Sequence, residues 1–213
     1  MRPVIFDLDG TLIDSAPGIA AGVNLALADF DRPALSLPKV ISFIGHGVPV
    51  LIAQVAEAAG IAATDEPALL AAFRRHYDAD PAGGSDLFPG VRDTLEALQA
   101  TATPLGLCTN KPEAPTFAIL EALDLRRYFD VVIGGDTLPQ RKPDPAPLRL
   151  AFDRIGASGA YVGDSEVDAA CAKAAGVPFF LFTEGYRKTP VADLPHLVAF
   201  DSFSDLPHLL AQG

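Results

Sequence analysis

Two aspartates at the end of an apolar run near the N-terminus are the first residues that could do chemistry. Asp7 and Asp9 follow the apolar residues 3–6 and precede Gly10 and Thr11. Such a run predicts a buried parallel strand, and Gly10 would let the chain bend so that both carboxylates approach one cation. A simple Asx-turn leaving a core strand fits the same residues. Matching groups elsewhere in the chain have to decide between these interpretations.

A hydroxyl and an amide follow the apolar run Leu105–Cys108. Thr109 and Asn110, with Lys111 behind them, precede a helical pattern, so their free backbone N–H groups could bind a phosphate. Thr109 or Asn110 acting only as a helix cap explains the same pattern.

A lysine set between prolines offers a fixed positive charge. Pro143 and Pro145 stiffen the loop after Lys142 and favour an extended backbone there, so that Lys142 could neutralise a phosphoryl group. The alternative is a solvated surface lysine ahead of a proline-started helix.

A second apolar run with acidic residues at its tip occurs at residues 160–163. Asp164 follows this run directly, and Asp168 lies four residues further on, one turn into a predicted helix. Together they could supply a metal ligand and a partner for the metal's water. Ordinary helix-terminus chemistry also favours acidic residues here, but it does not explain an acidic strand tip both here and at Asp7. Parallel strands open on one edge of a sheet, so all these groups should converge.

Hydrophobic periodicity predicts the elements that position these groups. Helical patterns fill the chain from Ser15 to a turn-rich linker at residues 80–85, and strand-like and helical runs alternate beyond it. We therefore expect an α/β protein with a Rossmann-like open parallel sheet and an inserted helical cap domain. The predicted core domain comprises residues 1–14 plus 86–213, and the cap comprises residues 15–85. The expected cap helices run from 15 to about 31, from about 37 to 47, from 48 to 59 and from 66 to 80.

Composition restricts the class of protein. The chain has 213 residues, of which 49% are hydrophobic and 20% charged, as in an ordinary globular enzyme. The net charge of −11 and the absence of a basic block argue against nucleic acid, and an anionic substrate would need a local metal, lysine or helix N-terminus. No run is apolar enough for a membrane span and no signal peptide is evident, so we expect a cytoplasmic protein. We expect it to be a monomer or homodimer. Cys108 and Cys171 are expected in the core.

Read in order, these motifs resemble those of the haloacid dehalogenase superfamily of phosphatases with a helical cap. The matching segments are residues 7–11, 109–111, 142–143 and 163–168. Residues 43–51 (FIGHGVPVL), with the Thr-Asn-Lys-Pro turn, are similar to the phosphoglycolate phosphatase branch.

The resemblance implies separate roles for the aspartates. Asp7 would be the nucleophile that forms an aspartyl-phosphate, and Asp9 would be the general acid and base. Mg²⁺ would be bound by Asp7, by the backbone carbonyl of Asp9 and by Asp164, with Asp168 holding a coordinated water.

Further residues would contact the substrate. The resemblance implies that Thr109, the N–H of Asn110 and Lys142 surround the phosphoryl oxygens. Gly45 and His46 of the cap would contact the organic part. The pair Arg74-Arg75 is interpreted as a solvated helix face, and His76 as a surface residue.

The resulting hypothesis is a magnesium-dependent phosphomonoesterase acting on a small phosphorylated metabolite, with 2-phosphoglycolate as the best guess. A sugar-phosphate phosphatase or a β-phosphoglucomutase-like enzyme is an alternative, because a mutase also needs Asp9. A non-catalytic phosphate-sensing module is a hypothesis from another class, but it would not need a cap of about seventy residues, which a phosphatase uses to exclude water.

Overall fold

A six-stranded parallel sheet forms the centre of the computed structural model, which describes residues 2–212. Its strand order is β5-β4-β1-β6-β7-β8, so β1 is a central strand flanked by β4 and β6. The strands are β1 (Val4–Phe6), β4 (Leu105–Cys108), β5 (Val131–Ile133), β6 (Ala160–Gly163), β7 (Phe179–Phe182) and β8 (Val198–Phe200). The prediction of an α/β fold with an open parallel sheet is confirmed.

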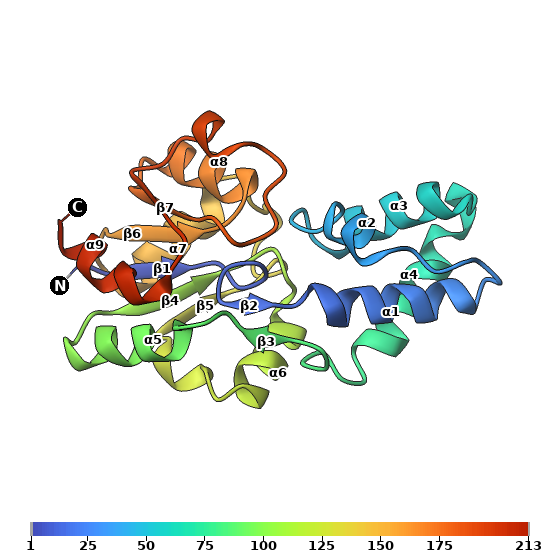
Figure 1. Ribbon diagram of the computed structural model, residues 1–213, viewed down its shortest axis with the longest axis horizontal. Helices are drawn as coiled ribbons and strands as arrows, with labels where there is room; N and C mark the ends of the chain where they lie inside the picture. The colour runs from blue at the N-terminus through green and yellow to red at the C-terminus, as the bar shows by residue number, and fades with distance from the viewer. Residues whose placement is uncertain (1, 213) are drawn as a thin grey trace.

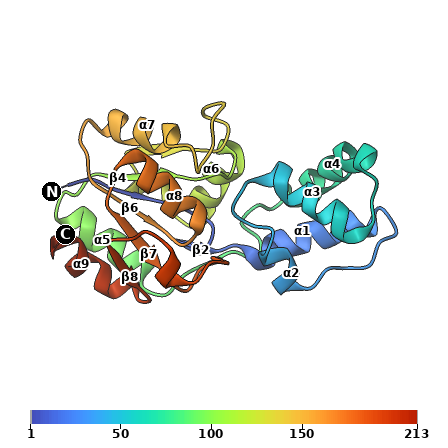
Figure 2. The same ribbon diagram turned by 90° about the horizontal axis from the view of Figure 1, so that it is seen from above.

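Helices cover both faces of this sheet (Figures 1 and 2). Their bounds are α5 (Val91–Ala100), α6 (Glu113–Ala122), α7 (Ala146–Ile155), α8 (Glu166–Ala175) and α9 (Leu206–Gln212). Phe6 of β1 packs in one core cluster with residues of α5, α6 and α9, whereas Ile5 packs in another with residues of α7 and α8. The strand is apolar throughout because both of its faces are covered.

The helices between β2 and β3 form a second lobe beyond one end of the sheet (Figure 1). They are α1 (Ala16–Ala28), α2 (Leu37–Ile41), α3 (Val48–Ala59) and α4 (Glu66–Tyr77). This helical lobe has its own hydrophobic core, in which Leu27, Val55 and Phe73 are fully or almost fully buried. Two short antiparallel strands, β2 (Ile13–Asp14) and β3 (Asp86–Leu87), connect it to the sheet. Strands of two residues are too short to be recognised from periodicity, and they were not predicted.

Several elements end earlier than their patterns predict. Helix α1 ends at Ala28 rather than near Asp31, and Asp31 has a positive φ of 52°. Helix α2 ends at Ile41 and could not reach residue 47 as predicted, because Gly45 and Gly47 have φ angles of 122° and 85° that no helix accommodates. The remaining turns include the short 3₁₀ helices Ala63–Asp65, Arg126–Tyr128, Val191–Asp193 and Phe203–Asp205.

The two cysteines and the polarity of the helices were also considered in the sequence analysis. Cys108 and Cys171 are free and buried, as predicted. Within residues 2–212, every helix is too short or too polar to cross a bilayer.

Candidate active site

The carboxyl edge of the sheet brings the predicted site residues together. The N–H of Asp7 donates to the carbonyl of Val162 in β6 at 2.9 Å, which fixes the tip of β1 beside the tip of β6. On the other side β1 pairs with β4, whose end leads directly into Thr109. Asp7 therefore lies between Thr109 and Asp164, although more than fifty residues separate neighbouring members in the chain.

Three buried carboxylates gather at this edge. One oxygen from each of Asp7, Asp164 and Asp168 lies within 4.8 Å of the others. Burial, opposed by Lys142 and reinforced by Asp168, raises the pKa of Asp7 to about 7. Burial, followed by the neighbouring charges of Asp168 and Asp7, also raises the pKa of Asp164 well above its usual range. A divalent cation would relieve this repulsion, and hard cations prefer carboxylate oxygens, so these residues fit a magnesium-like ion.

Asp164 is fixed by two hydrogen bonds and lies close to the backbone of Gly10. The Thr11 hydroxyl donates to its Oδ1 at 2.9 Å, and the Tyr186 N–H donates to its Oδ2 at 2.6 Å. Gly10 adopts a φ of 85°, and a Cβ at this position would lie 2.5 Å from Asp164 Oδ2. Glycine is therefore required at residue 10 both by the backbone conformation and by the closeness of the carboxylate.

Lys142 is buried among oxygen atoms rather than solvated. Its Nζ lies 2.8 Å from Asp7 Oδ1, 2.7 Å from Asp168 Oδ1 and 2.8 Å from the Tyr161 hydroxyl. Burial by itself would lower the pKa of Lys142, but Asp168 and Asp7 outweigh it and raise that pKa, so the side chain is a permanent ammonium. Apart from this ammonium, no group within residues 2–212 donates to Asp7 Oδ1, so this buried oxygen can accept a further bond. The interpretation of Lys142 as a surface lysine is wrong.

Asp168 anchors this lysine and the start of α8. Its Oδ2 accepts hydrogen bonds from the N–H and the hydroxyl of Ser165 at 3.1 and 2.6 Å, which forms a capping box. Burial opposes ionisation of Asp168, but Lys142 together with Ser165 and Tyr161 lowers its pKa, so it is a carboxylate. Sequence reasoning assigned Asp168 only to a metal-bound water and missed its contact with Lys142.

The turn after β4 connects the loop that carries Lys142 to the helical lobe. Asn110 Nδ2 donates to the carbonyl of Lys142 at 2.9 Å and to that of Gly45 at 3.0 Å. The N–H of Lys142 donates back to Asn110 Oδ1 at 3.0 Å. The Thr109 hydroxyl accepts from the Lys111 N–H at 3.2 Å and borders the cavity described below.

The carboxylate of Asp9 is not part of the cluster formed by the other three. Its two oxygens lie 3.0 and 3.1 Å from Lys111 Nζ, and the Ser15 hydroxyl donates to Oδ1 at 2.6 Å. Burial disfavours the charged form of Lys111, but Asp9 and then Tyr77 raise its pKa overall. Sequence reasoning assigned no role to Lys111, although it stands inside the Thr-Asn-Lys turn, because a sequence does not indicate where a long side chain points.

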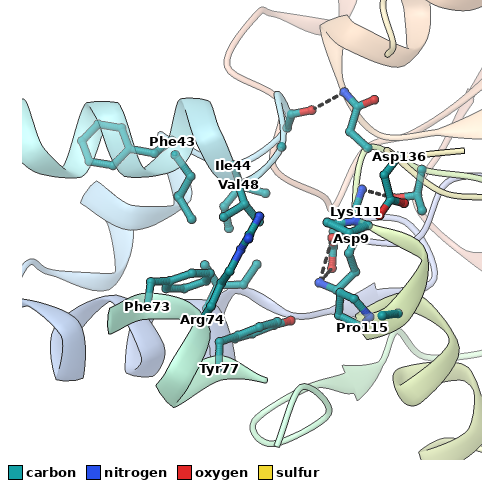
Figure 3. Close-up of a pocket in the computed structure, with 18 of the residues that line it drawn as sticks. Asp9, Phe43, Ile44, Val48, Phe73, Arg74, Tyr77, Lys111, Pro115 and Asp136 are labelled. Carbon is teal, nitrogen blue, oxygen red and sulfur yellow. Dashed lines mark hydrogen bonds and ion pairs between the residues drawn. The ribbon is translucent and has the colours of Figure 1, made fainter. Parts of the chain in front are cut away.

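A cavity of about 280 Å³ separates this edge from the helical lobe (Figure 3). Asp7, Asp9, Thr109 and Lys142 border it on one side. The apolar residues on the opposite wall are Ile19, Phe43, Ile44, Val48, Leu51 and Phe73.

The cap residues that border the cavity differ from those expected. Gly45 lies in the wall, but His46 is exposed and is not among the lining residues, so its position does not support a substrate contact. Arg74 and Tyr77 of α4 do line the cavity. The description of Arg74 as part of a solvated helix face is therefore incomplete.

A parallel sheet with carboxylates and a lysine at its carboxyl edge, covered by a helical lobe, defines the class of capped α/β hydrolases. The chain belongs to the haloacid dehalogenase-like hydrolase family, whose model matches residues 4–182. This finding confirms the family resemblance noted in the sequence.

Similar proteins extend the match over the whole chain. A protein from Cereibacter sphaeroides named phosphoglycolate phosphatase is 50% identical over 213 residues, covering 99% of this chain and 98% of that protein. One of the same name from Escherichia coli O157:H7 is 43% identical over 229 residues, covering 97% and 91%. A crystal structure of a predicted phosphoglycolate phosphatase from Haemophilus somnus superposes with a TM-score of 0.93 at 32% identity, covering 98% of this chain and 97% of that one.

Proposed function

We propose that this protein is a magnesium-dependent phosphomonoesterase that converts 2-phosphoglycolate to glycolate and phosphate. The observation that carries the proposal is the position of Asp7, a buried carboxylate beside Lys142 at the border of a cavity. Apart from the Lys142 ammonium, no group within residues 2–212 donates to its Oδ1, so this oxygen can still bind a ligand. The name shared by the similar proteins described above supports the choice of substrate.

Asp7 is the nucleophile in this proposal. Its carboxylate attacks phosphorus, the bond from phosphorus to the ester oxygen breaks, and an aspartyl-phosphate forms. Lys142, Thr109 and the N–H of Asn110 stabilise the charge on the phosphoryl oxygens during both transfers. Water then attacks phosphorus, and Asp7 is regenerated as inorganic phosphate leaves.

Asp9 is the general acid and base. It gives a proton to the departing ester oxygen of glycolate and later takes one from the attacking water, a task worth about 10²- to 10⁴-fold in rate. Lys111 and Ser15 hold its carboxylate on the cavity side of β1, away from the three-carboxylate cluster. This arrangement supports a division of roles between two aspartates that are only two residues apart.

Asp7, Asp164 and the backbone carbonyl of Asp9 would hold the magnesium ion, and Asp168 would orient its water. The bound ion supplies positive charge that lets an anionic nucleophile approach an anionic phosphate. The buried carboxylates and the raised pKa values of Asp7 and Asp164 support a cation at this position.

The cavity favours a small substrate over a sugar phosphate. Its cap wall is largely apolar and offers few partners for the several hydroxyl groups of a hexose. A phosphate-sensing module is disfavoured by family membership and by the lobe over the site. A mutase would use the same Asp9, and substrate profiling separates it from a phosphatase.

The domain division belongs to the same proposal. Residues 1–14 plus 86–213 would act as the catalytic core and residues 15–85 as a cap that excludes water during transfer. We also propose that the protein acts in the cytoplasm on a free metabolite, as a monomer or homodimer.

Phosphate release from a panel of phosphomonoesters tests this function. With Mg²⁺, wild type should hydrolyse 2-phosphoglycolate with a higher kcat/KM than glucose 6-phosphate or glucose 1-phosphate. EDTA and Asp7→Asn should each abolish turnover. Full activity in Asp7→Asn would refute the mechanism, and a kcat/KM for 2-phosphoglycolate no better than for sugar phosphates would refute the substrate.

A further inference from the structure

Two adjacent arginines on α4 have opposite surroundings. Arg75 Nη2 lies 2.7 Å from Asp29 Oδ2 on the outer surface of the lobe, with 62% of its side chain exposed. Arg74 is also an exposed residue, but it borders the active-site cavity, and its side chain has no ion pair or hydrogen bond with any residue between 2 and 212. Figure 3 shows it reaching from α4 toward Ile44 and Val48 on the facing wall. Asp78 lies one helical turn after Arg74, but its carboxylate is not within ion-pair distance of the Arg74 guanidinium.

The other cations of the cavity are already paired. Lys142 contacts Asp7 and Asp168, and Lys111 contacts both oxygens of Asp9. Among the cavity-lining residues Arg74 is therefore the cation left for a negative group on a ligand. A guanidinium suits a carboxylate because it can donate two parallel hydrogen bonds.

Tyr77 provides an independent sign of a ligand at the same place. The residue is 5% exposed, and the Lys111 ammonium is close enough to its hydroxyl to influence the pKa of Tyr77. An ammonium only donates, so the hydroxyl hydrogen has no acceptor within residues 2–212. Its ring stacks on Phe73 at 5.2 Å and lies 5.1 Å from Lys111 Nζ, so the ring cannot easily turn the hydroxyl elsewhere. Figure 3 shows this hydroxyl facing the region of Asp9 and Lys111. Buried hydroxyls normally donate as well as accept, so this one can still donate to an acceptor on a ligand, such as a carboxylate.

Residues 74 and 77 are three positions apart and therefore share one face of α4. We propose that Arg74 and Tyr77 bind the carboxylate of the substrate, while Asp7 and Lys142 receive its phosphoryl group. This inference rests on the proposed phosphatase function and names the substrate class as small phosphomonoesters with a second anionic group. Asp78 and Asp136 also line the cavity and would repel such a group, so a dedicated cation is needed.

The test compares two substrates that differ only at this end. Ethyl phosphate has a methyl group where 2-phosphoglycolate has its carboxylate. The measured quantity is the ratio of kcat/KM for 2-phosphoglycolate to kcat/KM for ethyl phosphate, with saturating Mg²⁺. Arg74→Gln should lower this ratio about ten- to one-hundredfold, Tyr77→Phe about three- to tenfold, and Arg74→Lys should restore part of the loss.

Two matched variants control for general effects. Arg75→Gln alters the neighbouring arginine outside the cavity, and Tyr128→Phe removes another buried tyrosine's hydroxyl, which donates to Glu96. Both should leave the ratio unchanged.

The possible outcomes distinguish this inference from the proposed function. A wild-type ratio near one would refute the substrate assignment itself. A high wild-type ratio that survives Arg74→Gln, or that falls equally in Arg75→Gln, would overturn only the carboxylate site. A folded Arg74→Gln variant, checked by an unchanged thermal midpoint, with a selectively reduced ratio would support it.

Discussion

Replacement of Lys142 by methionine tests the charge balance of the buried site. Lys142 Nζ is within 2.8 Å of oxygens from Asp7, Asp168 and Tyr161, and its side chain is 2% exposed. Methionine fills similar space but carries no charge, so Lys142→Met leaves two carboxylates buried without their cation. Breaking a buried ion pair in this way typically costs about 3–5 kcal/mol. For a chain of this length, that corresponds to a decrease of about 6–20 °C in thermal midpoint.

The assay is urea unfolding at neutral pH in EDTA, so that a bound divalent cation cannot compensate. Lys173→Met serves as the control, because Lys173 is exposed on α8 and should change stability by about 0.5 kcal/mol or less. The double variant Lys142→Met/Asp168→Asn should recover part of the loss, because it removes one of the stranded charges.

Two results would refute this reasoning. Wild-type stability for Lys142→Met would mean that the buried carboxylates do not depend on the lysine. Asp168→Asn alone completes the comparison. If the double variant loses as much free energy of unfolding as Lys142→Met and Asp168→Asn lose separately, added together, then Lys142 and Asp168 are not coupled. In either case the role of Lys142 in the site would have to be reconsidered.

Two further predictions concern the metal and the junction between the lobes. Mg²⁺ should raise the thermal midpoint of wild type in a concentration-dependent way, since it binds only the folded site. Asp164→Asn should remove this increase in thermal midpoint. An increase of unchanged size in Asp164→Asn would exclude Asp164 as a ligand. Gly18→Ala in α1 should lower the free energy of unfolding by about 1–3 kcal/mol, because its Cβ would lie 2.2 Å from the carbonyl oxygen of Gly83. A gain of about 1 kcal/mol in urea unfolding, as helix propensity alone predicts, would contradict that packing.

The sheet and its acidic edge could be predicted because they depend on local patterns. Uninterrupted apolar runs identify strands buried on both faces, and the polar residues after each run fall on the same edge of a parallel sheet. The tips of β1 and β6, with Asp7 and Asp164, are therefore foreseeable from residue order alone. From the sequence, Lys142 could be either a phosphate-binding residue or a solvated surface lysine. Its burial beside Asp168 in the structure excludes the surface position.

The cap side of the cavity could not be predicted in the same way. Helix α4 packs mainly against α1 and α3, and the lobe is connected to the sheet through the two-residue strands β2 and β3, whose patterns are too short to recognise. The sequence therefore does not show which part of α4 borders the cavity. Helical spacing places Arg74 closer than Arg75 to the face of α4 that carries Tyr77, but it does not show that this side of the helix borders the cavity. Tyr186 was missed for a similar reason: it contacts Asp164 and Asp14 from a loop after β7 that has no regular pattern.

Charge at the site explains how a protein with a net charge of −11 can hold an anionic substrate. Four carboxylates, those of Asp7, Asp9, Asp164 and Asp168, face two buried ammonium groups, those of Lys111 and Lys142. The formal excess is two negative charges, which one divalent cation would cancel. A phosphate dianion would then meet a neutral site instead of an acidic one, and the strong local fields of a buried site would favour its transfer. If the proposed substrate is right, the carboxylate of 2-phosphoglycolate would add one more negative charge that this balance does not cover, and the guanidinium of Arg74 would offset it.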